Sequence, residues 1–270
     1  MEAKEVKKIV RKSYAKVARK GSSCCGGDAK AENISKAIGY TKLELDSIPE
    51  EAILGLGCGN PTAIASLQEG EIVVDLGSGG GLDVFLAATK IGPTGKAIGI
   101  DMTPDMIDLA RDNAKKNNIT NVEFRLGEIE NLPVADNSAD IIISNCVINL
   151  SPEKLKVFQE SFRVLKPGGR LAISDLVLLR PLPESVRKNE KYLAGCIAGA
   201  ELKNKYVDFI EEAGFQDVQI ATEEGYLEDF DDEEILEDFG AEEFDNLEEE
   251  KEYIRKSIQS ITITAYKPKK

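Results

Sequence analysis

One stretch, residues 72–81, constrains the fold of this 270-residue chain more than any other. It begins with Ile72, Val73 and Val74, a short apolar run rich in β-branched residues that predicts a buried strand. Glycines occupy four of its last five positions, where a backbone can turn sharply after a strand and approach a ligand closely. The run 82–90 that follows is helix-like. A strand, a glycine loop and a helix N-terminus in this order predict a nucleotide-binding unit in an α/β fold.

The spacing of these glycines differs from the dinucleotide fingerprint. A G-x-G-x-x-G pattern that starts at Gly77 needs glycine at position 82, where this chain has leucine. The pattern is D-x-G-x-G-x-G instead, formed by Asp75, Gly77, Gly79 and Gly81. It resembles motif I of the class I S-adenosylmethionine-dependent methyltransferases. That resemblance implies that these residues and Ser78 bind S-adenosylmethionine; a glycine-rich turn in another α/β protein is the alternative.

Strands and helices alternate along the rest of the chain. We expect helices over 106–117 and 206–213, a helical segment over 184–200 that Gly195 and Gly199 interrupt, and a helix that starts with Ser151 as N-cap and Pro152 at the first helical position. After the strand that begins at Ile72 we expect six further strands, over 96–101, 121–126, 140–146, 170–177, 215–220 and 258–266. The alternation predicts a doubly wound, mostly parallel, seven-stranded sheet with helices on both faces.

Segments of different composition flank the predicted sheet, and we expect three parts, 1–68, 69–222 and 223–270. Residues 4–20 carry eight Lys or Arg, with apolar residues at helical spacing. This predicts an amphipathic helix, either with a solvated basic face or acting as a flap over the cofactor site. Residues 223–252 carry 17 Asp or Glu and one Lys, and predict an acidic, α-rich surface extension.

Charge and composition narrow the class of protein. The formal net charge of −14 argues against non-specific nucleic-acid binding. Without an apolar signal or a membrane-spanning run, the sequence predicts a cytoplasmic protein that does not enter a membrane, and we expect a monomer. The chain contains no histidine, so acid–base chemistry would need another side chain.

Residues at the predicted strand ends suit a cofactor. Asp101 ends the second strand, where a carboxylate can accept two hydrogen bonds from ribose hydroxyls. Met102 follows and is expected to pack near an adenine, which Glu128 and Ile129 should border. Asn145 ends the fourth strand and faces the glycine loop. Carboxyl ends of parallel strands are where such sheets bind ligands.

The five cysteines of the chain are Cys24, Cys25, Cys58, Cys146 and Cys196. In a chain of this length without a secretion signal we do not expect a disulfide scaffold. A cysteine is often a small buried apolar residue with an inert thiol. Three of these cysteines nevertheless fall where a substrate should bind. Thiolates without histidine or a C-x-x-C pattern suit a soft, thiophilic centre better than structural zinc.

The segments around these cysteines resemble the arsenite methyltransferase family. The resemblance lies in 145–152, preceded by 127–130, and in the cysteine motifs 55–61 and 194–196. It implies that Cys58, Cys146 and Cys196 hold trivalent arsenic and that Cys24 or Cys25 assists. It also implies arsenite or methylarsenite as substrate, S-adenosylmethionine as methyl donor, and an external thiol reductant such as a thioredoxin-type system.

The chemistry agrees with this resemblance. Trivalent arsenic has a lone pair that three thiolates leave exposed, so methylation needs no general base. Two alternatives stay open from the residues alone. One is a small-molecule C-, O- or N-methyltransferase with structural cysteines, and the other is a non-catalytic, thiol-based protein that binds metalloids.

Overall fold

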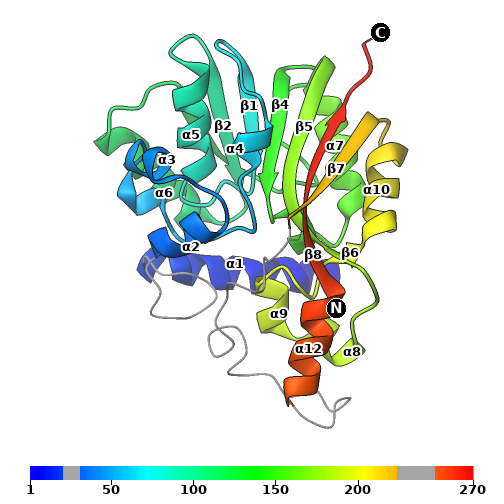
Figure 1. The fold of residues 1–270 in the computed structure, drawn as a ribbon. Coiled ribbons are helices and arrows are strands. Elements are labelled where there is room, and N and C mark those ends of the chain that lie inside the picture. The colour runs from blue at the N-terminus through cyan, green and yellow to red at the C-terminus, as the bar shows by residue number, and fades with distance from the viewer. Residues whose placement is uncertain (21–30, 224–246, 270) are drawn as a thin grey trace.

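The computed structural model describes residues 1–20, 31–223 and 247–269, which are organised around one twisted sheet (Figure 1). The strand order is β3-β2-β1-β4-β5-β8-β7, and β6 pairs with β5. The strands are β1 (Ile72–Leu76), β2 (Lys96–Asp101), β3 (Val122–Leu126), β4 (Ala139–Asn145), β5 (Leu165–Leu178), β6 (Glu201–Leu202), β7 (Gln216–Glu223) and β8 (Ile258–Tyr266).

Most of the sheet is parallel, as the alternating pattern predicts. β1 pairs in parallel with both β2 and β4, and β4 pairs in parallel with β5. β8 is antiparallel to β5 and to β7, so the last strand of the chain lies inside the sheet rather than at its edge. The seven predicted strands are confirmed, and the two-residue β6 is an addition to them.

Helices cover both faces of the sheet. They are α1 (Ala3–Lys20), α2 (Ala31–Ala37), α3 (Lys42–Asp46), α4 (Pro61–Ile64), α5 (Leu82–Ile91), α6 (Pro104–Lys116), α7 (Lys154–Val164), α8 (Glu184–Lys188), α9 (Glu190–Ala194), α10 (Lys203–Glu212) and α12 (Leu247–Ser257). Ile142 of β4 packs in one core with Phe158 of α7 and Tyr206 of α10. Its neighbour Ile143 packs in the opposite core with Phe85 of α5. This alternation explains why β4 is apolar on successive positions.

The start of α7 differs from the prediction. Ser151 and Pro152 precede the helix, which begins at Lys154, and Ile148–Leu150 form a 3₁₀ turn. The Ser151 hydroxyl donates to Glu130 at 2.6 Å and accepts from the Glu153 N–H at 3.1 Å. The prediction was wrong because the Ser151 side chain closes a local turn and binds Glu130, instead of capping a helix.

The helical segment predicted over 184–200, with interruptions at Gly195 and Gly199, is helical only as far as Ala194, and it already divides into α8 and α9 at Asn189. Beyond Ala194 the chain turns, and Cys196 takes a left-handed conformation with φ of 66°. Gly199 then passes so close to the Asn149 carbonyl oxygen that a Cβ atom would clash with it. The glycines of this segment therefore belong to a tight turn, and the turn brings Cys196 back toward the sheet.

The terminal segments meet at the same end of the sheet. α1, which confirms the predicted basic helix, runs beneath the end of the sheet at which β4 ends (Figure 1). Most of the acidic segment lies outside the described residues, but α12 is helical and Ile254 on it is buried. The three-part division at residues 68 and 222 stays a prediction. Among the described residues, no helix is long and apolar enough to cross a membrane.

Candidate functional site

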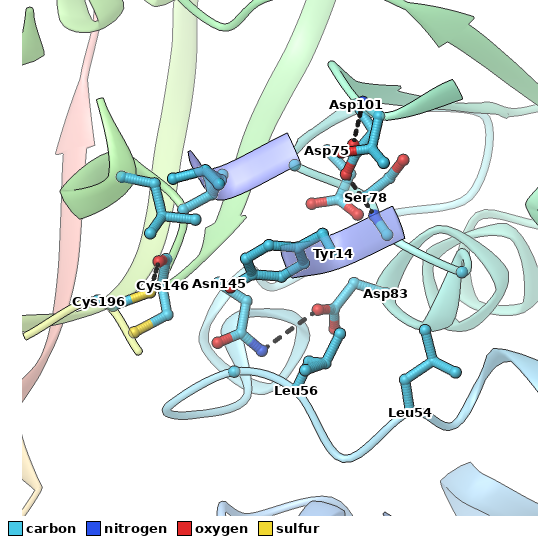
Figure 2. A pocket seen from close by; sticks show the side chains of 18 of the residues that line it. Tyr14, Leu54, Leu56, Asp75, Ser78, Asp83, Asp101, Asn145, Cys146 and Cys196 are labelled. Atoms are coloured by element: carbon cyan, nitrogen blue, oxygen red, sulfur yellow. Dashed lines mark hydrogen bonds between the residues drawn. The ribbon is translucent and has the colours of Figure 1, made fainter. Parts of the chain in front are cut away.

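A cavity lies at the carboxyl ends of β1, β2 and β4, where the sequence places its candidate residues. It contains about 1320 Å³ of space, partly open to solvent. Figure 2 shows acidic side chains on one side of it, two cysteines on the other, and Tyr14 between them. The predicted residues on its wall are Asp75, Gly77, Ser78, Gly79, Asp101, Met102, Ile129, Asn145, Cys146 and Cys196.

The glycine loop between β1 and α5 needs its glycines for different reasons. Gly77 has φ of 67°, and a Cβ there would collide with the side chain of Val147. Gly79 has φ of 50°, and a Cβ there would meet nothing within 4 Å. Gly81 caps α5 with φ of 99°, and a Cβ there would lie 2.7 Å from Phe85. Gly81 thus permits the close packing of loop and helix, and it does not line the cavity.

Three buried carboxylates give one wall of the cavity its charge. Asp75, Asp83 and Asp101 are at most 8% exposed. Burial, followed by the charges of Asp83 and Asp101, raises the pKa of Asp75 well above its usual range. Burial raises the pKa of Asp83 to about 6, although hydrogen bonds from Tyr40 and Asn145 oppose the shift. Carboxylates whose ionised forms are this costly favour a bound cation.

This wall fits S-adenosylmethionine, which carries a sulfonium and an ammonium group. Asp101 accepts from the Gly79 N–H at 3.0 Å and from the Thr103 N–H at 2.8 Å, and a carboxylate has further acceptor positions for ribose hydroxyls. Burial raises the pKa of Asp101 as well. The buried Ser78 hydroxyl has no hydrogen-bond partner among the described residues, so a polar ligand could satisfy it.

The structure distinguishes Glu128 from Glu130. The Glu128 carboxylate is absent from the cavity wall and pairs with Lys7 of α1 at 2.9 Å. Glu130 and Ile129 do line the cavity, and Glu130 lies 3.2 Å from the same lysine. Lys7 and Tyr14 also line the cavity, so α1 forms part of its wall. This agrees with the flap interpretation of the basic helix.

The Asn145 side chain contacts several parts of the site at once. Its Oδ1 accepts from the Cys58 N–H at 2.9 Å. Its Nδ2 donates to the Gly59 carbonyl at 2.8 Å and to the Tyr40 hydroxyl at 2.9 Å. The Tyr40 hydroxyl in turn donates to Asp83 at 2.7 Å. The residue at the end of β4 thus bonds both to the acidic wall and to the loop that carries Cys58.

Three of the five cysteines belong to one buried cluster. Cys58 and Cys146 form a disulfide, with Cα atoms 5.7 Å apart. The Cys196 Sγ donates to the Cys146 carbonyl oxygen at 2.8 Å. All three pack in the same apolar cluster, although Cys58 is fully buried and only Cys146 and Cys196 reach the cavity wall. The structure therefore brings these three cysteines together, as the sequence predicts.

Two of these cysteines have an unusual backbone. Cys146 has φ of 58° and Cys196 has φ of 66°, in the left-handed region that residues other than glycine seldom adopt. Such conformations cost on the order of 1–3 kcal/mol and are concentrated at functional sites. The other two cysteines, Cys24 and Cys25, lie outside the described residues, and their role stays a prediction.

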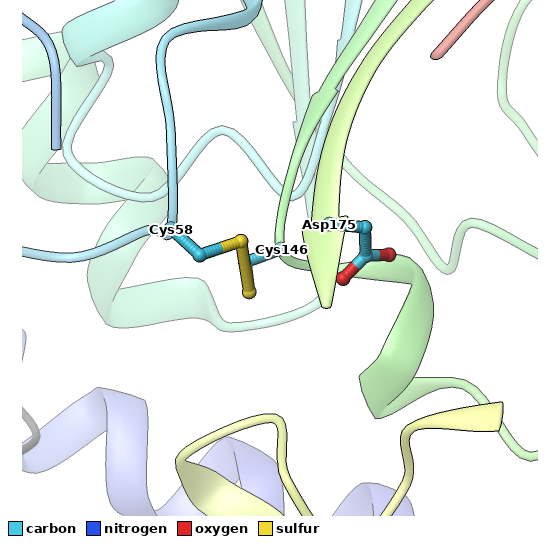
Figure 3. A group of neighbouring side chains, drawn as sticks. All are labelled: Cys58, Cys146 and Asp175. Atoms are coloured by element: carbon cyan, nitrogen blue, oxygen red, sulfur yellow. A yellow bond between two sulfur atoms is a disulfide. The ribbon is translucent and has the colours of Figure 1, made fainter. Parts of the chain in front are cut away.

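The buried carboxylate of Asp175, on β5, lies next to the sulfurs of Cys58 and Cys146. One carboxylate oxygen of Asp175 and the sulfurs of Cys58 and Cys146 lie within 4.8 Å of one another (Figure 3). Tyr206 donates to Asp175 at 2.8 Å, and so does Asn149. Burial raises the pKa of Asp175 to about 7. No local pattern singles out Asp175, because it lies within an apolar strand.

Sequence reasoning also missed Asp83, Tyr40 and Lys7. Asp83 lies in the first turn of α5, where an acidic residue usually interacts only with the helix dipole. Tyr40 is 43 positions away from its partner Asp83, so no local pattern connects them. Lys7 was one of eight basic residues in its helix, and only the fold selects it.

Comparison with known proteins gives a consistent result. A family model described as a methyltransferase domain matches residues 67–214. An arsenite methyltransferase from Halobacterium salinarum is 48% identical over 230 residues, which cover 80% of this chain and 59% of that protein. An arsenite methyltransferase from Aquipseudomonas alcaligenes is 35% identical over 228 residues, which cover 80% of this chain and 63% of that protein.

A solved structure agrees with these relatives. The crystal structure of an arsenic(III) S-adenosylmethionine methyltransferase from Chlamydomonas reinhardtii matches with a TM-score of 0.61 at 31% identity, over 90% of this chain and 75% of that chain. The chain spans about three-fifths of the length of the two curated relatives. The matches to the domain model and to most of the Chlamydomonas chain show that this chain belongs to the arsenite methyltransferase family, within the class I methyltransferases.

Proposed function

We propose that this chain methylates arsenite, with trivalent arsenic bound to the thiolates of Cys58, Cys146 and Cys196. The observation that carries the proposal is the gathering of these three residues in one apolar cluster beside the acidic cavity. Thiolates are the ligands that a soft, thiophilic centre prefers. A carbon, oxygen or nitrogen acceptor would need none of them.

S-adenosylmethionine, when bound, supplies an electrophilic methyl group to the arsenic lone pair. We assign its ammonium group to the wall formed by Asp75 and Asp83, and its ribose to Asp101. The other cofactor-binding residues in this proposal are Gly77, Ser78, Gly79, Met102 and Ile129. Gly81 shapes the loop from behind the cavity wall, and the Asn145 amide faces the cavity from the end of β4. Glu130 replaces Glu128 in this proposal, because Glu130 lines the cavity and Glu128 does not, although both pair with Lys7 of α1.

The chain's own residues would chiefly hold and orient the substrate. Three thiolates occupy the three bonding directions of arsenic and leave its lone pair exposed, so no side chain has to remove a proton for the transfer. Fixing the acceptor in place converts a bimolecular step into an effectively unimolecular one. The apolar surroundings of Cys146 and Cys196 keep water away from the bound arsenic.

Two of the proposed ligands can also return electrons to arsenic. After methyl transfer arsenic is formally pentavalent. If Cys58 and Cys146 leave arsenic together and form a disulfide, their two electrons restore the trivalent state. The Cys58–Cys146 disulfide in the structure supports this pairing. An external thiol reductant, such as a thioredoxin-type system, would then cleave the disulfide, with Cys24 or Cys25 assisting.

Further parts of the proposal concern the whole protein. We propose that it acts in the cytoplasm and as a monomer, on arsenite or methylarsenite. We also propose that residues 1–68 carry the helix and the Cys58 loop that close the site, that 69–222 bind the cofactor, and that 223–270 form an acidic helical extension and the last strand. The pairing of Lys7 with Glu128 and Glu130 supports the first of these assignments.

The test is to incubate the reduced protein with arsenite, a thiol reductant and S-adenosylmethionine, and to separate the arsenic species by chromatography. We expect methylated arsenic from the wild type and none from Cys146→Ser or Cys196→Ser. Binding of S-adenosylhomocysteine serves as the folding control for each variant. Full first-step turnover in either variant, or a wild type that binds cofactor yet leaves arsenite unmethylated, would overturn the proposal.

A further inference from the structure

We propose that Asn145 is a positioning residue that couples occupancy of the cofactor cavity to the placement of Cys58. This inference rests on the proposed function for the role of Cys58. Asn145 and Cys146 are consecutive at the end of β4, and Cys146 forms the disulfide with Cys58. The end of β4 therefore carries both the proposed ligand Cys146 and the Asn145 amide, which holds the loop of the proposed ligand Cys58.

The amide bonds to the Cys58 loop on two sides. Oδ1 accepts from the Cys58 N–H at 2.9 Å, and Nδ2 donates to the Gly59 carbonyl at 2.8 Å. These bonds fix both peptide groups that flank the Cys58–Gly59 link. From the other direction, Ser260 of β8 donates to the Cys58 carbonyl at 3.0 Å. The backbone of Cys58 is thus held between two strands that are not neighbours in the sequence.

The loop is shaped around this amide. Gly57 has φ of 109°, and a Cβ there would lie 2.6 Å from Nδ2 and 2.7 Å from Oδ1 of Asn145. Any larger residue at position 57 would therefore displace the Asn145 amide. The close approach of loop and amide explains the glycine before Cys58 without reference to the ligand.

The same amide faces the acidic wall of the cavity. Its Nδ2 donates to the Tyr40 hydroxyl at 2.9 Å and lies 3.4 Å from Asp83 Oδ2, a contact that is dashed in Figure 2. Tyr40 and Asp83 both line the cavity. A ligand that holds Asp83 in place would hold Tyr40 and the amide with it. The loop with Cys58 would then be more firmly closed when the cofactor is bound, and by linkage a closed loop would favour the cofactor.

The reactivity of Cys58 reports this coupling. Cys58 is fully buried, so an alkylating reagent reaches its thiol only when the loop opens. We would reduce the protein, remove the reductant, add iodoacetamide, and measure the labelling rate of Cys58 by mass spectrometry. The rate is measured without S-adenosylhomocysteine and at a concentration that saturates each variant, as determined by calorimetry.

In the wild type we expect saturating S-adenosylhomocysteine to slow Cys58 labelling by about tenfold or more, within the usual range of coupling between sites. In Asn145→Ala, Cys58 should be labelled faster than in the wild type, and saturating S-adenosylhomocysteine should change the labelling rate by less than about twofold. Asn60→Ala is the matched control, since its amide caps α4 from the same loop and donates to the Gly39 carbonyl, with no hydrogen bond to Cys58 or Asp83 among the described residues. It should keep the wild-type protection.

A second variant decides the matter if Asn145→Ala does not fold. Tyr40→Phe removes the hydroxyl that bonds to both Asn145 and Asp83, leaves only the long 3.4 Å contact between those two side chains, and keeps both bonds to the loop. It should label at about the wild-type rate without S-adenosylhomocysteine and lose most of the protection with it. Full protection in Tyr40→Phe would overturn the inference.

The remaining outcomes also decide the question. Protection in Asn145→Ala equal to that of the wild type, or loss of protection in Asn60→Ala, would overturn the inference. So would an Asn145→Ala protein that folds but no longer binds S-adenosylhomocysteine, because the amide would then be a cofactor ligand. The assay contains no arsenic, so it can fail while arsenite is methylated. Conversely, a wild type that binds S-adenosylhomocysteine but methylates no arsenite would contradict only the proposed function.

Discussion

Protonation of Asp83 should control the affinity of the cavity for its cationic cofactor. Asp83 is 7% exposed, and burial raises its pKa to about 6. A cation binds better to the ionised carboxylate, so affinity should fall as the pH is lowered. Between pH 8 and pH 5 the ionised fraction of a group with this pKa falls about tenfold, equivalent to about 1.4 kcal/mol of binding free energy.

The stability of the cofactor-free protein should change in the opposite sense. The folded-state pKa of Asp83 lies above the ordinary value of 3.8, so the folded state holds the proton more tightly than the unfolded state. The resulting contribution to stability is present below about pH 4 and is lost as the pH rises through about 6. The increase in melting temperature caused by S-adenosylmethionine should therefore grow with pH.

Calorimetric titration with S-adenosylmethionine at pH 5, 6, 7 and 8 measures the effect directly. Asp83→Asn should bind weakly and lose the part of the pH dependence that is centred near pH 6. Asp112→Asn, which changes an exposed acid on α6, should keep the wild-type profile. The reasoning is refuted if wild-type affinity is the same at pH 5 and pH 8, or if Asp83→Asn retains the full change.

Two further substitutions test the glycine loop and α1. Gly77→Ala places a Cβ against Val147 and should lower the free energy of unfolding, measured by urea titration, by about 1–3 kcal/mol. The loss should be larger than in Gly79→Ala, whose Cβ meets nothing within 4 Å. Equal losses in the two variants would contradict the steric argument. Lys7→Met removes the ion pairs to Glu128 and Glu130 and should weaken S-adenosylmethionine binding by a few-fold, within about 1 kcal/mol, because α1 is held less firmly. The exposed Lys12→Met is the control, and an equal effect of both lysine substitutions on affinity would show that the loss of any positive charge suffices.

The sequence predicted the features that depend on neighbouring residues. The run that begins at Ile72 and the glycines after it fix a strand and a turn locally, and the alternation of strands and helices along the chain predicts a mostly parallel sheet. Asp101 was predicted because the second strand of such folds ends at the ribose site. The structure places Asp101 on the cavity wall, bonded to the glycine loop.

Features that depend on tertiary contacts could not be predicted in this way. Glu128 and Glu130 are equivalent in the sequence and both pair with Lys7, but only Glu130 is buried against Ser151 and lines the cavity. Serine is a common helix N-cap residue, but the Ser151 hydroxyl donates to Glu130 instead. Asn145 was predicted to contact the cofactor, whereas its amide also holds the Cys58 loop from 87 positions away.

We propose that three cysteines converge on one arsenic atom, and X-ray absorption at the arsenic edge counts the neighbours of that atom directly. The sample is the reduced protein with one equivalent of arsenite and S-adenosylhomocysteine. We expect three sulfur neighbours in the wild type, and two sulfurs with one oxygen in Cys58→Ser. An arsenic atom surrounded by oxygen in the wild type, or a sulfur count that Cys58→Ser leaves unchanged, would contradict it.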